Sequence, residues 1–192
     1  MPKVLVLFYS RTGKTASLAD AIAEGAGSVK FTEVEIRRVE DLGSPPASDA
    51  DDSSNVARAA LAKKYRVLES VDSLTQYDAL VIGGPVRHGV MSAELTHTLD
   101  QARALAERGA LVDKVGSVFG SAPAEGSHDT DIIAMLRPLM HFGMIIVPPG
   151  SGDRAAAAMD DLAAARKQGA RVAKVAEWVR HAKSHEAHGH RH

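Results

Sequence analysis

Short apolar segments alternate five times with segments of helical periodicity, and no other feature of this chain limits its fold so strongly. The first apolar segment, residues 3–8, is a continuous β-rich run, typical of a strand buried on both faces. The next segment, residues 15–26, has its apolar side chains at helical spacing. The other expected strands are residues 33–39, 79–82, 116–119 and 144–147, and the other expected helices are residues 55–68, 93–108, 130–142 and 160–182.

This alternation predicts an α/β fold: a doubly wound parallel sheet of five strands with helices on both faces. The expected strand order is 2-1-3-4-5, and in such sheets ligands bind outside the carboxyl ends of the strands. The chain has 192 residues, which fit a single domain. We assign that domain to residues 1–183 and expect the His-rich residues 184–192 to form a disordered tail.

Composition excludes several kinds of chemistry. The chain has no cysteine, which rules out disulfides, Cys-ligated zinc, iron–sulfur clusters and thiol nucleophiles. It has no signal-peptide pattern and no apolar run near the roughly 18 residues of a membrane span, so we expect a cytoplasmic protein without membrane insertion. A net charge of −1, with no basic block, argues against nucleic acid as a partner.

A polar turn joins the first strand to the first helix. It consists of Ser10, Arg11, Thr12, Gly13, Lys14 and Thr15. A helix N-terminus offers unpaired N–H groups and a partial positive charge, the three hydroxyls add donors, and the glycine allows a tight bend. The turn lacks the P-loop and dinucleotide-binding patterns, so it suits a phosphate monoester better than a bridging pyrophosphate. The alternative interpretation is a capped turn without a ligand.

Two loops rich in small residues follow the third and fourth expected strands. In the first, residues 83–92, glycines would let the backbone approach a flat ring, Arg87 could stabilise negative charge on that ring, and His88 could stack on it. A solvated loop is the alternative for both side chains. The second loop is residues 120–129. His141 lies just before the fifth strand, where a histidine is more often a helix cap than a catalytic group.

Together these segments resemble the WrbA-type NAD(P)H:quinone oxidoreductases of the flavodoxin-like superfamily. The resemblance rests on residues 3–10 with Gly13, on residues 84–89 with 91–92, on residues 109–111 with Lys114, and on residues 99–101, 141–148 and 165–169. It implies a flavodoxin-like fold, an FMN cofactor, NADH or NADPH as cosubstrate, and a homotetramer. The implied activity is two-electron reduction of quinones, for which we expect hydride transfer through flavin N5.

The resemblance also assigns the residues that would bind FMN. The turn at residues 10–15 would hold its phosphate. The other expected contacts are Pro85, Val86, Arg87, Ser121, Ala122, Pro123, Ala124, Glu125, Gly126 and His141. Arg87 and His141 are the candidate catalytic residues, which would stabilise reduced flavin or position the acceptor. We assign no metal-binding site.

The chain departs from the family pattern at several places. The family usually has Thr at Val86, Phe at His88 and Trp at Ala106, and its loop after the fourth strand is richer in Gly and Thr. A long family loop with a Gly-x-Pro-Tyr-Gly-Ala segment is missing after Gly150, where residues 151–154 follow at once.

Two alternative functions and one further feature stay open at this point. A one-electron flavodoxin-type carrier would usually be strongly acidic and rich in aromatics near the ring, unlike this chain. A non-enzymatic assembly or regulatory module with a weakened FMN site is the second alternative. The end of the chain, residues 181–192, contains five histidines, which could bind nickel, copper or zinc but are more simply interpreted as a solvated terminus.

Overall fold

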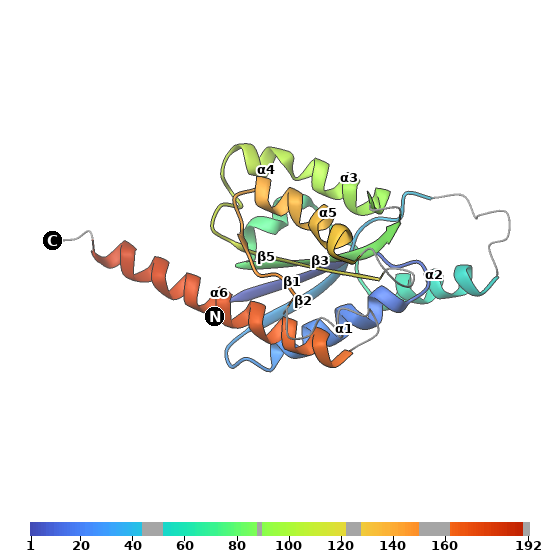
Figure 1. Ribbon diagram of the computed structural model, residues 1–192, viewed down its shortest axis with the longest axis horizontal. Coiled ribbons are helices and arrows are strands. Elements are labelled where there is room, and N and C mark those ends of the chain that lie inside the picture. The colour runs from blue at the N-terminus through green and yellow to red at the C-terminus, as the bar shows by residue number, and fades with distance from the viewer. Residues whose placement is uncertain (44–51, 88–89, 122–127, 150–161, 190–192) are drawn as a thin grey trace.

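A computed structural model describes residues 1–43, 52–87, 90–121, 128–149 and 162–189 (Figure 1). In chain order, the elements are β1 (Lys3–Phe8), α1 (Lys14–Gly27), β2 (Glu33–Arg38), α2 (Asp52–Lys64), the 3-10 helix η1 (Val71–Gln76), β3 (Ala79–Arg87), β4 (Val90–Met91), α3 (Ala93–Gln101), α4 (Arg103–Glu107), β5 (Val115–Ser121), α5 (His128–His141), β6 (Ile145–Ile146) and α6 (Leu162–Gly189). Each helix within these ranges is too short or too polar to cross a membrane.

The five parallel strands lie in the order β2-β1-β3-β5-β6, which confirms the predicted doubly wound sheet. β3 is longer than expected, because it continues through the Gly-Gly-Pro segment and still pairs with β5 at Pro85 and Ser121. The two residues of β4 then return antiparallel to β3, with Val86 opposite Met91. A two-residue strand leaves no periodic pattern, so the sequence did not predict it.

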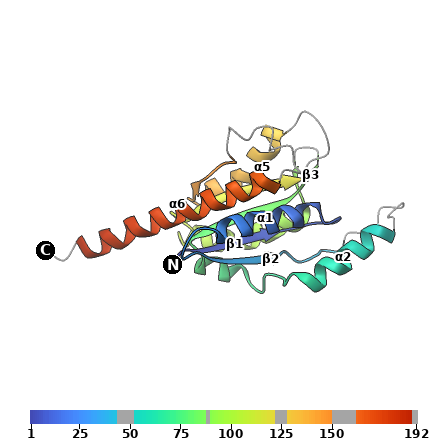
Figure 2. The same ribbon diagram turned by 90° about the horizontal axis from the view of Figure 1, so that it is seen from below.

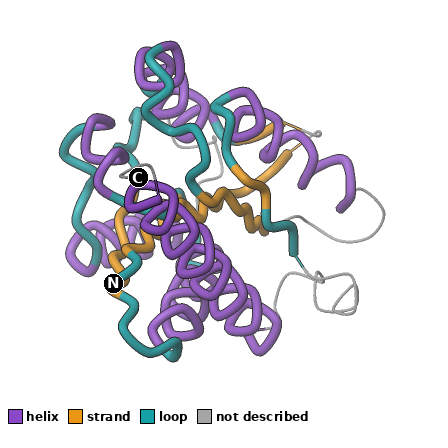
Figure 3. Tube along the Cα trace, turned by 90° about the vertical axis from the view of Figure 1, so that its left-hand side faces the viewer, coloured by secondary structure: helices purple, strands orange, loops and turns teal. Residues whose placement is uncertain are grey.

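Two helical layers cover the sheet (Figures 1 and 2). One core contains α1 and α6 residues together with Val4, Val6 and Phe8 of β1. The other core contains residues of α3, α4 and α5 together with Leu5 and Leu7 of the same strand. Successive side chains of a strand point to opposite faces, and here both faces are covered. This explains the continuous apolar run of β1, which lies between β2 and β3 inside the sheet. Figure 3 shows the strands with helices on both sides of them.

Several helices differ from their expected bounds. The helix expected over residues 93–108 is divided at Ala102 into α3 and α4. α2 ends at Lys64, because the following segment forms a bridge between Val67 and Arg38 at the edge of β2. α6 continues to Gly189, so residues 184–189 of the expected tail belong to this helix. The shortened segment after Gly150 lies outside the described residues.

α1 and α6 pack with their backbones in direct contact at two glycines. A Cβ atom on Gly25 would lie 1.9 Å from the carbonyl oxygen of Arg166, and one on Gly169 would lie 2.0 Å from that of Ile22. The Arg166 guanidinium also pairs with the Glu24 carboxylate at 2.7 Å. The two helices can therefore approach this closely only while both glycines lack side chains.

We expect Gly25→Ala to lower the free energy of unfolding by about 2 kcal/mol or more, because the added methyl group would force the helices apart. Gly27→Ala is the matched control: it lies in the same helix, and its Cβ would meet only a Val34 methyl group at 4.0 Å. The control should be neutral or stabilising by up to about 1 kcal/mol. Urea unfolding measures both changes, and equal destabilisation by the two variants would contradict the close-contact interpretation.

Candidate functional site

The turn after β1 has a geometry that only glycine adopts readily at its centre. Gly13 lies in the left-handed region at φ +96° and occupies the N-cap position of α1. Its N–H donates to Ser10 Oγ at 3.1 Å, and its carbonyl accepts the first helical bond from the Ser17 N–H at 3.0 Å. Ser10 and Thr15 are buried at 9% and 2% exposure. The turn is therefore a defined structure at the end of a buried strand.

This turn fits the phosphate of FMN. Gly13 has no side chain with which to cap the helix, and a Cβ atom built on it would meet no atom of the described residues within 4 Å. The first N–H groups of an α-helix have no carbonyl partner within the helix, and they carry a partial positive charge. An open, positively polarised helix start beside buried hydroxyls is a suitable site for a phosphate monoester.

The strand register brings three of the expected binding segments to one edge of the sheet. Phe8 lies opposite Gly83, and the Tyr9 N–H donates to the Gly83 carbonyl at 2.9 Å. On the other side of β3, Pro85 lies opposite Ser121 at the end of β5. Three segments therefore adjoin one another: the turn at Ser10–Thr15, called the phosphate turn below, the Pro85–Arg87 segment, and the start of the loop after β5. Residues 88–89 and 122–127 lie outside the described residues, with Ala122, Pro123, Ala124, Glu125 and Gly126 among them.

Two expectations about β3 change in the structure. The sequence suggests that the glycines of β3 let a flat ring approach. In the structure, a Cβ on Gly83 would lie 2.1 Å from the Phe119 ring, and one on Gly84 would lie 2.3 Å from Leu95. Core packing is therefore sufficient to require both glycines. The side chain of Val86 is buried with Leu95 in the α3–α5 core at 1% exposure, so this side chain is not available to a ligand at the sheet edge.

His141 lies at the opposite edge of the sheet. It ends α5, and β6 begins four residues later, with Ile145 opposite Val115 at the start of β5. The Gly143 carbonyl accepts the Asp113 N–H at 3.0 Å, which fixes this connection below the amino ends of the strands. One chain therefore does not place His141 beside Ser10.

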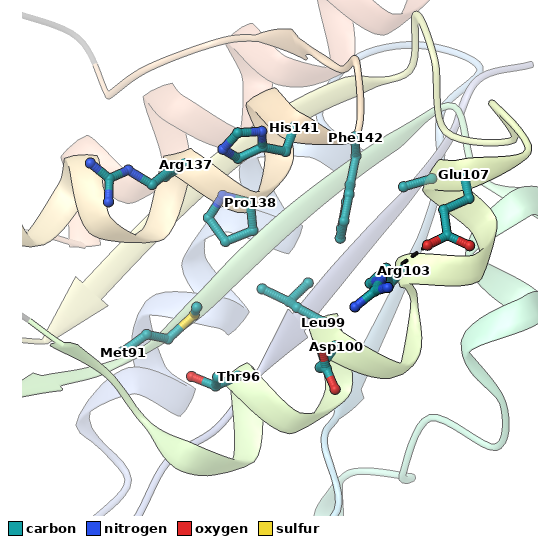
Figure 4. Close-up of a pocket in the computed structure, with 11 residues that line it drawn as sticks. Met91, Thr96, Leu99, Asp100, Arg103, Glu107, Arg137, Pro138, His141 and Phe142 are labelled. Carbon is teal, nitrogen blue, oxygen red and sulfur yellow. Dashed lines mark hydrogen bonds and ion pairs between the residues drawn. The ribbon is translucent and has the colours of Figure 1, made fainter.

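His141 instead lines a groove of about 580 Å³ between α3, α4 and α5 (Figure 4). Met91, Leu99 and Phe142 provide apolar lining, and an ion pair of 3.0 Å between Arg103 and Glu107 lies along one side (Figure 4). The groove lies among the helices of one of the two layers that cover the sheet. Its size and apolar lining suit either a ligand or a protein surface.

A buried tyrosine–carboxylate pair lies behind the phosphate turn, and the sequence analysis missed it. Tyr9 and Glu94 are 5% and 4% exposed, and the Tyr9 hydroxyl hydrogen-bonds to the Glu94 carboxylate. Burial raises the pKa of Tyr9, and the bond to Glu94 raises it further. Tyr9 precedes Ser10, and Glu94 precedes the Leu95 that packs under Gly84, so the pair connects two binding segments. The sequence feature that could have indicated this buried pair is a glutamate beside apolar helix positions.

A parallel sheet of this order, covered by helices on both faces, defines a flavodoxin-like protein. Solved structures agree: the fold is similar to a WrbA-like flavodoxin from Agrobacterium tumefaciens, with a TM-score of 0.64 and 22% identity over 93% of this chain and 99% of that one. A flavodoxin from the domain Archaea has a TM-score of 0.59 and 18% identity over 91% and 99% of the chains.

The chain belongs to the NADPH-dependent FMN reductase family, whose model matches residues 2–157. An NAD(P)H dehydrogenase (quinone) of Rhodopseudomonas palustris strain HaA2 is 38% identical over 150 residues, covering 77% of this chain and 70% of the relative. One of the same description from Bradyrhizobium diazoefficiens is 36% identical over 173 residues, covering 88% and 82%. The resemblance found in the sequence is confirmed, and so is the class of flavin-using oxidoreductase.

Tyr9→Phe tests the buried pair. The variant should unfold about 1–3 kcal/mol more easily at pH 8, because Glu94 loses a buried hydrogen-bond donor. At a pH above about 10, the ordinary pKa of tyrosine, the folded protein keeps the Tyr9 proton, whereas the unfolded chain releases it. The contribution of this group to the stability of the wild type therefore falls as the pH rises past 10. The difference in the free energy of unfolding between wild type and Tyr9→Phe should therefore narrow by up to about 1.4 kcal/mol per pH unit above pH 10. Urea unfolding from pH 8 to 11 measures it, and a constant difference would contradict the assignment.

Proposed function

We propose that this protein is an FMN-dependent NAD(P)H:quinone oxidoreductase. In the overall reaction, NAD(P)H, a proton and a quinone give NAD(P)⁺ and a hydroquinone. FMN held by the protein would supply the two-electron redox chemistry, by which the hydride of NAD(P)H would be taken up at N5 and both electrons given to the quinone. The open turn at Ser10–Thr15, on the carboxyl edge of a flavodoxin-like sheet, is the observation that carries the proposal. Family membership and the names of the quinone dehydrogenase relatives support it.

In this proposal the turn holds the phosphate through hydroxyl and backbone donors. Ser10 Oγ already accepts the Gly13 N–H, so its own proton is left to donate to a phosphate oxygen. Thr15 adds a buried hydroxyl in the first turn of α1. Arg11, Thr12 and Lys14 stand at the same turn, where their donors and two positive charges favour a dianion.

The flavin ring would lie along the ends of β3 and β5. Pro85 and Val86 would provide backbone groups at its edge, and Arg87 would stabilise negative charge that develops on reduction. The family resemblance also assigns Ser121 and residues 122–126 to the FMN site, and residues 122–126 lie outside the described residues. These ring contacts rest on the family resemblance and on the register that sets Pro85 beside Ser121.

We further propose that the active form is a homotetramer in which His141 serves a neighbouring subunit. The family resemblance makes His141 an FMN contact, yet within one chain it lies at the far edge of the sheet from Ser10. A second copy resolves this conflict if the face around the α3–α5 groove packs near its flavin. His141 would then stabilise reduced flavin or position the quinone. A cytoplasmic location completes the proposal.

The double variant Ser10→Ala/Thr15→Ala tests the phosphate assignment. It should weaken FMN binding at least a hundredfold, because two hydrogen bonds to a charged phosphate, each about 1.5–3 kcal/mol, are lost. Ser17→Ala is the control: its hydroxyl lies on the same helix but is bound to the Gly13 carbonyl at 3.3 Å. Fluorescence titration of FMN measures both affinities. A double variant that binds FMN as tightly as wild type would refute the assignment.

Turnover tests the enzymatic claim. The FMN-loaded protein should oxidise NADH or NADPH only when a quinone such as 1,4-benzoquinone is present, with one hydroquinone formed per nucleotide oxidised. Dithionite should take the bound flavin from oxidised to two-electron-reduced without a stable intermediate state. FMN binding without turnover, combined with stable one-electron reduction, would instead establish the carrier. A protein that does not bind FMN at all would favour the non-enzymatic module.

The shared-site proposal predicts complementation between two defective chains. His141→Ala should retain FMN but lose turnover, and Ser10→Ala/Thr15→Ala should lose FMN. Mixed oligomers, formed by co-expression, would contain intact sites. Each such site would combine the Ser10–Thr15 turn of the His141→Ala chain with His141 of the Ser10→Ala/Thr15→Ala chain, so activity should reappear. Sedimentation velocity should give a tetramer. Mixed oligomers with no more activity than the separate variants would refute a shared site.

A further inference from the structure

The far end of α6 carries two histidines at helical i, i+4 spacing. The rings of His181 and His185 have centroids 4.5 Å apart and planes tilted by 57°, and both side chains are exposed. Residues four apart lie on the same side of a helix, one turn from each other. The two imidazoles therefore stand side by side on an exposed part of the helix.

This end of α6 extends away from the sheet toward the C-terminus (Figures 1 and 2). Its contacts with the domain come from Arg180, which bonds the Met1 carbonyl, and from Lys183, whose Nζ lies 3.3 Å from the Asp113 carbonyl oxygen. The last described helical turns follow Lys183. His181 thus lies where the helix is still held by the domain, and His185 lies in the part that projects from it.

We propose that His181 and His185 chelate one divalent transition-metal ion, of the class that prefers imidazole nitrogen: Zn²⁺, Ni²⁺ or Cu²⁺. Ligand nitrogens lie about 2.0–2.1 Å from such ions, which requires the two nitrogens to approach to roughly 3 Å. Neighbouring rings already this close need only side-chain rotation to reach that geometry. Within the described residues no third side chain joins them in a ligand group, so water would complete the coordination shell.

Chelation would also stabilise the end of the helix. The two nitrogens reach one ion only while residues 181–185 stay helical. Binding therefore stabilises the helical state of this segment relative to its unwound state. A bound ion would therefore hold the projecting turns to the part of α6 anchored by Arg180 and Lys183. This role is separate from flavin chemistry, because the pair lies near the amino edge of the sheet, where Lys183 meets Asp113.

Calorimetry on FMN-loaded protein tests the proposal, with Zn²⁺ as the probe. Wild type should bind one equivalent, and His181→Ala and His185→Ala should each weaken that binding at least tenfold. Mg²⁺, which prefers oxygen ligands, should give no signal. His97→Ala is a control on another helix, where the ring nitrogen lies 2.9 Å from the Gln101 amide, and it should leave binding unchanged.

A tail variant separates the helical pair from the histidines that follow it. His188→Ala/His190→Ala/His192→Ala should retain Zn²⁺ binding at wild-type affinity within about threefold. Loss of binding in this triple variant, with binding kept in His181→Ala and His185→Ala, would overturn the proposal in favour of an unstructured tail site. Wild type that binds no Zn²⁺ would also overturn it.

Trypsin provides a second readout that does not depend on heat of binding. Cleavage after Lys183 requires the helix there to open, so Zn²⁺ should slow it severalfold in wild type and have no effect in His185→Ala. FMN content should be the same with and without Zn²⁺ in both proteins. Equal cleavage rates of wild type with and without Zn²⁺ would contradict chelation by the helical pair.

Discussion

The burial of β1 between two helical layers is the constraint on which the site depends. Its side chains point alternately into the α1–α6 core and the α3–α5 core, so the strand cannot shift along its axis without exposing apolar residues on both faces. The chain leaves this fixed strand at Tyr9, whose N–H bonds Gly83 and whose hydroxyl bonds Glu94. Ser10 and Gly13 are thereby placed before any ligand arrives, which is what a cofactor site requires.

The same architecture explains why one chain separates His141 from the other expected FMN-binding residues. Parallel strands with helical crossovers gather loops at the carboxyl edge, and each helix returns the chain to the amino edge. Ser10, Pro85 and Ser121 therefore come together, whereas His141, at the end of α5, is carried away from them. In the proposed tetramer a neighbouring chain would place its His141 beside the flavin. Oligomerisation would then be needed to complete the catalytic site.

The fold was predictable because strand burial and helical periodicity are local patterns, and the alternation of elements leaves few topologies. The glycine-centred start of α1 at residues 10–15 was predictable because its residues adjoin along the chain, and its binding of a phosphate stays a prediction. What the sequence did not predict depends on tertiary contact. The pairing of Tyr9 with Glu94 joins residues distant in sequence, and the backbone contact of Gly25 with Arg166 gives no periodic signal. The packing role of Gly83 and Gly84 was not predicted because Phe119 and Leu95 approach them only in the folded sheet.

The central claim is that the turn at Ser10–Thr15 binds the flavin through its phosphate. Comparing the dissociation constants of FMN and riboflavin for the same apoprotein tests it most directly, because the two ligands differ only in that group. The account predicts that FMN binds at least a hundredfold more tightly, since two or more charge-assisted hydrogen bonds depend on the phosphate. Equal affinity for the two flavins would contradict it.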